Sequence, residues 1–479
     1  MDTPENDESK RRPRRPRQPK VVILSWRFSA APSRPAAQRA TLINQNQYSR
    51  LLRTVNPVQI PVFSPLPSYL VHFSNNYCAS LLWPGLMPRA SPDANHPGVT
   101  CWLSLSTRHS ALHSAFLFGS YIHRNMQSLL KRKGYFNAAD VYYTRICEAD
   151  AIAKINRAIQ DPVQAISDEV ILSVLCLATN QLEGVKELQP KDTSFQPPLQ
   201  SLQWLDIYGC MLTNPIHQAG LVQLVNLRGG LDKLELPGLA AVISFFSILS
   251  ASQTLSRPQF PFMSLYFGRQ MTLHQLLLSR GPTQDIEQES LIEVTMPEMQ
   301  NIFRGLQAYI SLVQEHQEGM LAEVAGMTLC DFRNLLQWHI LSLLPASHLG
   351  HDLQFYPVYE SCRLALVIFG VGIIFPLPLE ASRLPTLATM LRSELASFNE
   401  KALPQNPALA KLRCWCLLLG GIAAKGSQHR QWYVGELRAF AQIHSLSTWD
   451  EVKLMAKSIS WLEIACDAAG MQLWDETRH

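Results

Sequence analysis

Charged residues are scarce in this chain of 479 residues, and the two signs nearly balance. Asp, Glu, Lys and Arg make up 17% of the chain, apolar residues 47%, and the formal net charge is +4. Seven of the 42 basic residues fall between Lys10 and Lys20, so the remainder is close to neutral. A chain this long and apolar can bury a large core, but its body lacks a field suited to binding nucleic acid.

Long hydrophobic runs are also missing. The longest apolar run, Leu364 to Phe375, falls well short of the ~20 residues that span a bilayer, and the N-terminus has no signal-peptide pattern. We therefore expect no transmembrane segment and no membrane partner. The cysteines are scattered within apolar helical patterns, which predicts reduced, buried thiols in an intracellular protein. They stand at positions 78, 101, 147, 176, 210, 330, 362, 414, 416 and 466.

The motifs that would indicate an enzyme are absent. There is no G-x-S-x-G, no P-loop and no H-E-x-x-H, and Gly370-Val371-Gly372 lacks the third glycine and the preceding strand of a dinucleotide site. The sequence predicts no catalytic residue and no cofactor.

Three further sets of residues have both a ligand-binding and a structural interpretation. His109 and His113 stand four apart and could share a metal, but no carboxylate or cysteine lies beside them on that face, which favours buried or partly buried histidines. Cys414-x-Cys416 has the wrong spacing for a metal or redox pair and is interpreted as structural burial. The C-terminal tryptophans could line a small-molecule pocket, although helical spacing favours a core position. They are Trp415, Trp432, Trp449, Trp461 and Trp474. We predict no metal site.

The first 68 residues are predicted to be a disordered arm and linker. Met1 to Ser9 is acidic and Lys10 to Lys20 is basic with three prolines, so neither can bury enough apolar surface to fold. Three interpretations of the basic run are open: a nuclear import signal, which we favour, a non-specific nucleic-acid arm, or a solvated tail. Its candidate import residues are Lys10, Arg11, Arg12, Arg14, Arg15, Arg17 and Lys20.

The central stretch, His217 to Leu234, predicts a helix that stops at Gly229-Gly230, where a left-handed residue would be needed. A second helix is expected to begin with Pro237 near its first turn and to end at 256–258. Arg228 could hydrogen-bond the last carbonyls of the first helix. The two helices would form a hairpin.

Helical signals continue to the end of the chain. Arg333 is expected to begin a helix, and Glu360 another. Thr448 and Glu451 predict a capping box on a long final helix, with a hydrophobic seam running from Val452 to Ala469. The predicted fold class is all-α, with one large multi-helix domain over residues 69–479.

The same residues resemble the fungal-specific transcription factor domain, the regulatory region usually found downstream of a binuclear zinc cluster. The resemblance spans roughly Tyr69 to Trp474. The residues that carry it most clearly are His217, Arg228, Gly229, Gly230, Pro258, Pro261, Trp415, Gly420, Gly421, Trp432 and Trp461.

The resemblance implies a nuclear regulator of transcription that is specific to one pathway, such as a secondary-metabolite gene cluster. Implied partners are other transcription factors or coregulators, a homodimer or heterodimer, and a possible small-molecule effector, with DNA contacted only indirectly or weakly. The alternative from another class is a soluble helical interaction scaffold without a transcriptional role.

The sequence departs from the family at its DNA-reading module. The zinc cluster needs six closely spaced cysteines, whereas the first cysteine here is Cys78. A gene start placed too far downstream, an isoform lacking its first exon, and a regulator acting only through partners are all open explanations. The chain as it stands is not expected to read a promoter sequence.

Overall fold

The computed structural model describes residues 64–88, 96, 98–130, 138–181, 194–278, 297–319, 325–349, 356–378, 383–397 and 407–478. These residues form helices and no β-strand, apart from two isolated β-bridges, Gln181 with Leu212 and Met263 with Gln270. The predicted all-α class is confirmed. The basic run and the predicted arm up to residue 63 lie outside the described residues.

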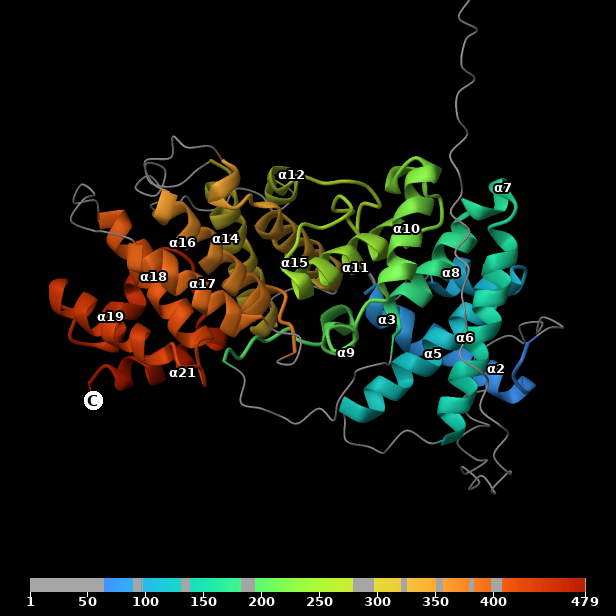
Figure 1. Cartoon of the computed structure of the whole chain (residues 1–479), viewed down its shortest axis with the longest axis horizontal. Coiled ribbons are helices and arrows are strands. Elements are labelled where there is room, and N and C mark those ends of the chain that lie inside the picture. Colours follow the sequence, from blue (N-terminus) through green and yellow to red (C-terminus); the bar gives the residue numbers. More distant parts are fainter. Residues whose placement is uncertain are drawn as a thin grey trace, which may run out of the picture. The chain divides into compact units, whose positions relative to one another are not determined.

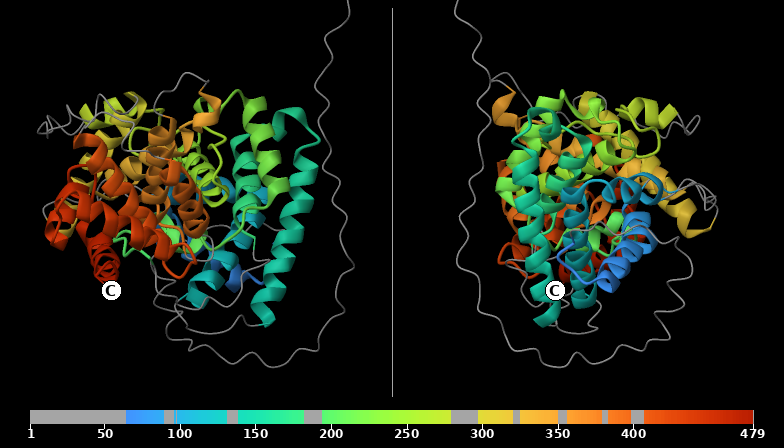
Figure 2. Two further views of the ribbon diagram at one scale, coloured as in Figure 1. Left: turned by 60° about the vertical axis from the view of Figure 1, so that its left-hand side comes forward. Right: turned by 90° about the vertical axis from the view of Figure 1, so that its right-hand side faces the viewer.

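The N-terminal helices are organised around α5, whose apolar residues are buried from Leu112 to Met126. Helices α2, α6 and α8 all pack against α5, and Figures 1 and 2 show α5, α6 and α8 side by side. The group comprises α2 (Ser68–Tyr77), η1 (Cys78–Leu82), α3 (Trp83–Leu86), η2 (Gly98–Trp102), α4 (Leu103–Ser106), α5 (Ser110–Leu130), α6 (Ala138–Ala158), α7 (Pro162–Ala165) and α8 (Asp168–Thr179).

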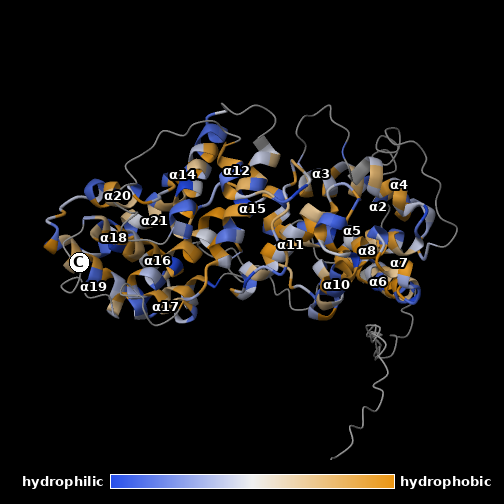
Figure 3. Cartoon of the chain, turned by 90° about the horizontal axis from the view of Figure 1, so that it is seen from above, coloured by the Kyte–Doolittle hydropathy of each residue, from blue (hydrophilic) through white to orange (hydrophobic). Residues whose placement is uncertain are grey.

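The central helices surround α11, which is buried on all sides and contacts both α8 and α15. A helix that is apolar all round needs this position, because no face of it is suited to water. Figure 3 shows hydrophobic residues along α8 and α11, and hydrophilic residues on α14. The central elements are η3 (Leu202–Trp204), α9 (Leu205–Tyr208), α10 (Pro215–Arg228), η4 (Leu231–Lys233), α11 (Leu239–Thr254), α12 (Leu273–Leu278), α14 (Pro297–Gln317) and α15 (Ala325–Ser342).

The C-terminal helices pack around α18, which contacts its neighbours α16, α17, α19, α20 and α21. Their elements are η5 (Ala346–His348), α16 (Tyr356–Phe369), η6 (Gly370–Ile374), α17 (Leu384–Ser397), α18 (Pro407–Ala423), α19 (Arg430–Ile443), α20 (Trp449–Lys457) and α21 (Glu463–Glu476).

One continuous segment in this group, Tyr356–Ile374, is long and apolar enough to cross a membrane by length and composition. It exceeds the apolar run noted in the sequence because α16 begins at Tyr356. Its apolar window is 89% buried inside the fold, which is the environment of a core helix.

Several predicted helix limits are wrong. Pro237 lies outside α11, because Gly238 adopts a left-handed conformation (φ 81°) and the helix starts at Leu239. The Pro237 carbonyl accepts a hydrogen bond from Trp102 Nε1 at 2.9 Å, which holds this turn. Arg333 lies in the middle of α15 rather than at its start, and α16 begins four residues before Glu360.

The predicted final helix is broken into α20 and α21. The capping box at its start is confirmed, since Thr448 Oγ1 accepts from Glu451 N and the Glu451 carboxylate accepts from Thr448 N. The chain leaves the helix after Lys457, however, and Trp415 Nε1 donates a 2.6 Å hydrogen bond to the buried carbonyl of Ser460. This contact from α18 favours the break over a continuous helix.

Candidate functional site

The predicted helix stop at Gly229-Gly230 is confirmed. Gly229 is left-handed (φ 102°, ψ 16°), and its N–H donates to the Asn226 carbonyl while the Gly230 N–H donates to Val225. This pair of bonds is a Schellman motif. Gly230 has φ 106° and ψ 175°, a combination open almost only to glycine.

Gly230→Val should therefore destabilise the fold by roughly 1 to 3 kcal/mol, because a β-branched side chain strains this backbone. No atom outside the turn lies within 4 Å of a Cβ at this position, so the effect would come from the backbone and not from a clash. Melting followed by far-UV circular dichroism is the measurement, with Gly435→Val as a helical control facing open space. An equal loss in both variants would contradict the argument.

Arg228 ties the hairpin to the start of α8. Its Nε donates to the carbonyl of Lys233 at 3.1 Å, so the expected bond to the carbonyls of its own helix is replaced by one to the next turn. Its Nη2 lies 3.6 Å from Oδ1 of Asp168. Oδ2 of Asp168 accepts from the N–H groups of Glu235 and Leu236 at 2.8 and 2.6 Å. Segments some 60 residues apart in sequence are thus held by one carboxylate.

The segment with Pro258 and Pro261 is fastened to α11 by two serines. Ser247 Oγ accepts from the N–H groups of Gln259 and Phe260, and Ser244 Oγ donates to the Pro261 carbonyl at 3.0 Å. Trp338 of α15 adds a bond from Nε1 to the Phe260 carbonyl at 2.9 Å.

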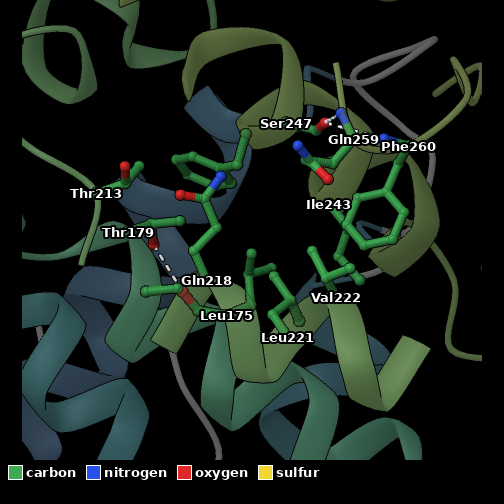
Figure 4. Close-up of a pocket in the computed structure, with 12 residues that line it drawn as sticks. Leu175, Thr179, Thr213, Gln218, Leu221, Val222, Ile243, Ser247, Gln259 and Phe260 are labelled. Carbon is green, nitrogen blue, oxygen red and sulfur yellow. Dashed lines mark hydrogen bonds between the residues drawn. The ribbon is translucent and has the colours of Figure 1, made fainter. Parts of the chain in front are cut away.

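A hollow lies between the helical hairpin and α8, and Figure 4 shows its lining side chains. It is partly open to solvent, and its enclosed space is about 20 Å³, room for about one water molecule. Its walls come from α8, α10, α11 and the residues after α11, and apolar side chains dominate them. The lining residues are Leu175, Ala178, Thr179, Thr213, Gln218, Leu221, Val222, Ile243, Phe246, Ser247, Gln259 and Phe260.

The polar groups of the hollow are largely engaged in the fold. Thr179 Oγ1 donates to the Leu175 carbonyl, and Gln218 Nε2 donates to Ser250 Oγ at 3.0 Å. The exposed Gln259 side chain lies at the rim. Burial lowers the pKa of the neighbouring His217 on α10 to about 4, so its ring is neutral at pH 7. The hollow is small and presents no acid–base pair for chemistry.

The C-terminal signature glycines allow helices to approach closely. A Cβ on Gly420 would overlap the ring of Tyr433, and one on Gly421 would overlap Leu473. These positions bring α19 and α21 against α18. The signature glycines are therefore packing residues.

The signature tryptophans also have structural roles. Trp415 and Trp461 are buried, and Trp461 Nε1 donates to Asp467 at 2.7 Å. Trp432 is half-buried, with the Arg392 guanidinium 5.6 Å from its ring centre. Trp474 is buried as well, and Trp449 is half-buried. The prediction of core positions for the C-terminal tryptophans is thus confirmed for three of the five.

Cys414 and Cys416 are both buried, as predicted for structural thiols. Burial raises the pKa of Cys414 to about 12 and that of Cys416 well above its ordinary value, so both are protonated. Within the described ranges, no group of three or more His, Cys, Asp or Glu side chains could hold a metal ion.

His109, which is exposed and precedes α5, and His113 on α5 do not face a common site. His109 Nε2 lies 3.3 Å from Glu169 Oε1, a carboxylate from α8 that sequence spacing could not reveal. His113 is buried, and neither ring nitrogen has a hydrogen-bond partner among the described residues. Burial, with a contribution from Lys154, lowers the pKa of His113 to about 4.

His113→Leu should make the fold less sensitive to acid. An unfolded histidine titrates near pH 6.5, so between pH 6.5 and 4 the unfolded chain binds more protons than the native one, and stability falls as the pH is lowered. The shift corresponds to roughly 3 kcal/mol at the acid end of this window. Urea unfolding at pH 7 and pH 4.5 is the measurement, with the exposed His274→Leu as control. An unchanged pH dependence in His113→Leu would contradict the prediction.

Sequence reasoning missed two buried polar groups of α15. Arg333 is fully buried and donates to the Leu202 carbonyl at 2.7 Å and to Gln203 Oε1 at 2.6 Å. The Asp331 carboxylate accepts hydrogen bonds from the Ser264 hydroxyl and the Leu265 N–H, in the turn after Met263. Burial raises the pKa of Asp331 to about 6, against the opposing effect of three hydrogen bonds.

Comparison with known proteins returned no match, whether to a protein-family model, a curated protein or a solved structure. The α10–α11 hairpin and its hollow are therefore interpreted from the sequence and the contacts of this chain alone.

Proposed function

We propose that this protein is a nuclear regulator of transcription that acts through its helical domain. A DNA-binding partner, or a zinc module missing from this sequence, would bring it to the promoter. By analogy with the family it resembles, its targets would be the genes of one pathway, such as a secondary-metabolite cluster.

The observation that carries the proposal is that residues which carry the family resemblance are bonded to one another in the structure. Asp168, Arg228 and the Gly229-Gly230 stop form one connected unit, and the segment from Pro258 to Pro261 is fastened to the same hairpin. Most of these residues also carry the resemblance to the fungal-specific transcription factor domain. Residues that match a family and also contact one another in one structural unit are less easily explained by chance than matching residues scattered over the fold. The unit supports kinship with the regulatory domain, and it contains no reacting group.

Nuclear entry is the first test. Replacing Lys10, Arg11, Arg12, Arg14, Arg15, Arg17 and Lys20 with alanine in a fluorescent fusion should leave the protein cytoplasmic, because import receptors recognise dense basic runs. The matched control changes only the five arginines to lysine, which keeps the charge and should keep import. Nuclear accumulation of the alanine variant at the wild-type level would refute the import signal.

A tethering assay tests regulation directly. The full chain is fused to an unrelated sequence-specific DNA-binding domain, and transcription from a reporter carrying that domain's site is measured. The proposal expects the reporter to change several-fold in either direction, and expects the change to be lost in Gly230→Val. Reporter output equal to that of the DNA-binding domain alone, with the fusion present in the nucleus, would favour the scaffold alternative.

A small-molecule effector, as the resemblance implies, would act at the hollow between α8, α10 and α11. Its apolar walls favour an apolar ligand group, with Gln259 at the rim available for hydrogen bonding.

A further inference from the structure

Residues 264–269, in the connection between α11 and α12 (Figure 1), form a turn that a buried carboxylate holds from below. Asp331 accepts a hydrogen bond from the Ser264 hydroxyl at 2.5 Å. It also accepts from the backbone N–H groups of Leu265 and Tyr266 at 2.7 and 3.2 Å. Burying a carboxylate is costly, and here its hydrogen-bonding capacity is directed at the backbone of one turn.

The backbone of the turn also closes on itself. Ser264 N donates to the Arg269 carbonyl at 2.9 Å, and Gly268 N donates to the Ser264 carbonyl at 3.0 Å. Gly268 is left-handed (φ 65°), and Met263 and Gln270 form a β-bridge at the base. The conformation of the turn is therefore fixed by its own backbone hydrogen bonds and by those to Asp331, before any partner binds.

The tip of this fixed turn carries two adjacent aromatic side chains that face solvent. Tyr266 is 47% and Phe267 40% exposed, and their rings lie 4.8 Å apart in an edge-to-face arrangement. The Arg269 guanidinium lies 5.9 Å from the centre of the Phe267 ring. We call Tyr266, Phe267 and Arg269 the aromatic tip.

Tyrosine, phenylalanine and arginine are enriched at protein interfaces, and tyrosine and arginine are common among the residues that dominate binding energy. A single exposed apolar residue needs no explanation, but an adjacent aromatic pair on a preorganised turn differs from scattered exposure. Preorganisation matters because a fixed turn loses little conformational entropy when a partner binds.

The charge of the segment indicates the chemistry of the partner. Arg257 and Arg269 are both exposed, and the described stretch 256–278 contains no Asp or Glu. The two carboxylates that contact this segment are both engaged, since Asp331 is buried beneath the turn and Asp232 accepts from the Gln270 amide at 3.0 Å. An acidic partner complements this surface, and a basic one would be repelled.

We propose that the aromatic tip docks an acidic polypeptide segment with apolar side chains, supplied by a partner protein. Nucleic acid fits less well, because the edge-to-face rings do not offer consecutive open faces for stacking and the body of the chain is nearly neutral. This docking role does not depend on the protein acting in transcription.

A displayed library of random 16-residue peptides, selected against the full chain, provides the probe. We expect enriched peptides to combine Asp or Glu with Leu, Phe or Trp. One such synthetic peptide is then titrated by fluorescence anisotropy. Combining Tyr266→Ala with Phe267→Ala should weaken binding at least tenfold, and Arg269→Glu at least threefold, with the Arg269 effect shrinking as salt is raised.

The matched control combines Val141→Ala with Tyr142→Ala, an adjacent exposed pair on α6, and should bind the peptide like the wild type. Circular dichroism checks that every variant remains folded. Ser264→Ala loosens the turn without altering the tip, and should weaken binding by an intermediate amount.

Three results would overturn the proposal. One is a selection that enriches no peptide, or enriches peptides that bind the tip variants as tightly as the wild type. Another is enrichment of basic or uncharged peptides that are indifferent to Arg269→Glu. The third is tip-dependent binding of a dT20 oligonucleotide or of phosphatidylserine vesicles that exceeds binding of the acidic peptide.

Discussion

Arg333→Ala is expected to destabilise the fold by about 3 to 5 kcal/mol, since it removes a buried charge around which the acceptors are already arranged. Arg333 is fully buried, and its hydrogen-bond acceptors within the described part of the chain are uncharged oxygens. Its charge is instead accommodated by the Leu202 carbonyl, by Gln203 and Asn334 side-chain oxygens, and by the ring faces of Phe245 and Phe375.

The substitution should also release a strained stretch of backbone. Gln203 and Trp204 both have left-handed φ values of 55°, a conformation that is unfavourable for side chains of this size. Gln203 links Arg333 and Asn334 to the Leu86 carbonyl, and Trp204 Nε1 donates to the Leu82 carbonyl. Without Arg333, part of the force that holds this conformation is lost.

The midpoint of urea unfolding, followed by circular dichroism, measures the effect. Arg333→Lys keeps the charge but lacks the planar fork of donors, so it should recover only part of the loss. The control is Arg145→Ala, whose side chain is 61% exposed and whose ion pair with Glu148 should contribute less than about 1 kcal/mol. An Arg333→Ala midpoint equal to the wild-type value would show that the network is dispensable.

Asp168→Ala is expected to cost about 2 to 4 kcal/mol, because two partly buried backbone N–H groups lose their charged acceptor. These are the N–H groups of Glu235 and Leu236, and the attraction to Arg228 is lost with them. Asp168→Asn keeps an oxygen acceptor without the charge and should lose about half as much.

Glu235→Ala is the matched control for this site. The Glu235 carboxylate lies 3.9 Å from the same Arg228, but its side chain is 88% exposed, so its removal should change stability by less than about 0.5 kcal/mol. Equal effects of the Asp168 and Glu235 substitutions would mean that the hairpin is not anchored through the buried carboxylate.

Features that depend on neighbours in sequence were predicted well from the sequence alone. The Gly229-Gly230 stop and the Thr448–Glu451 capping box were both recognised correctly. Each is a bond or a backbone conformation within a few residues, so the residue types and their spacing are sufficient to specify it. The all-α class follows from the same local periodicity.

Features made by residues far apart in sequence were decided only by the tertiary structure. The break between α20 and α21 is stabilised by the hydrogen bond from Trp415 to Ser460. The buried Arg333 is bonded to Gln203, which lies 130 residues away in sequence. Asp331 likewise acts on a turn more than 60 residues before it. Local sequence determined the Gly229-Gly230 stop and the capping box, whereas packing determined the other helix limits and which polar groups are buried together. Burial and partner distance depend on the folded chain as a whole.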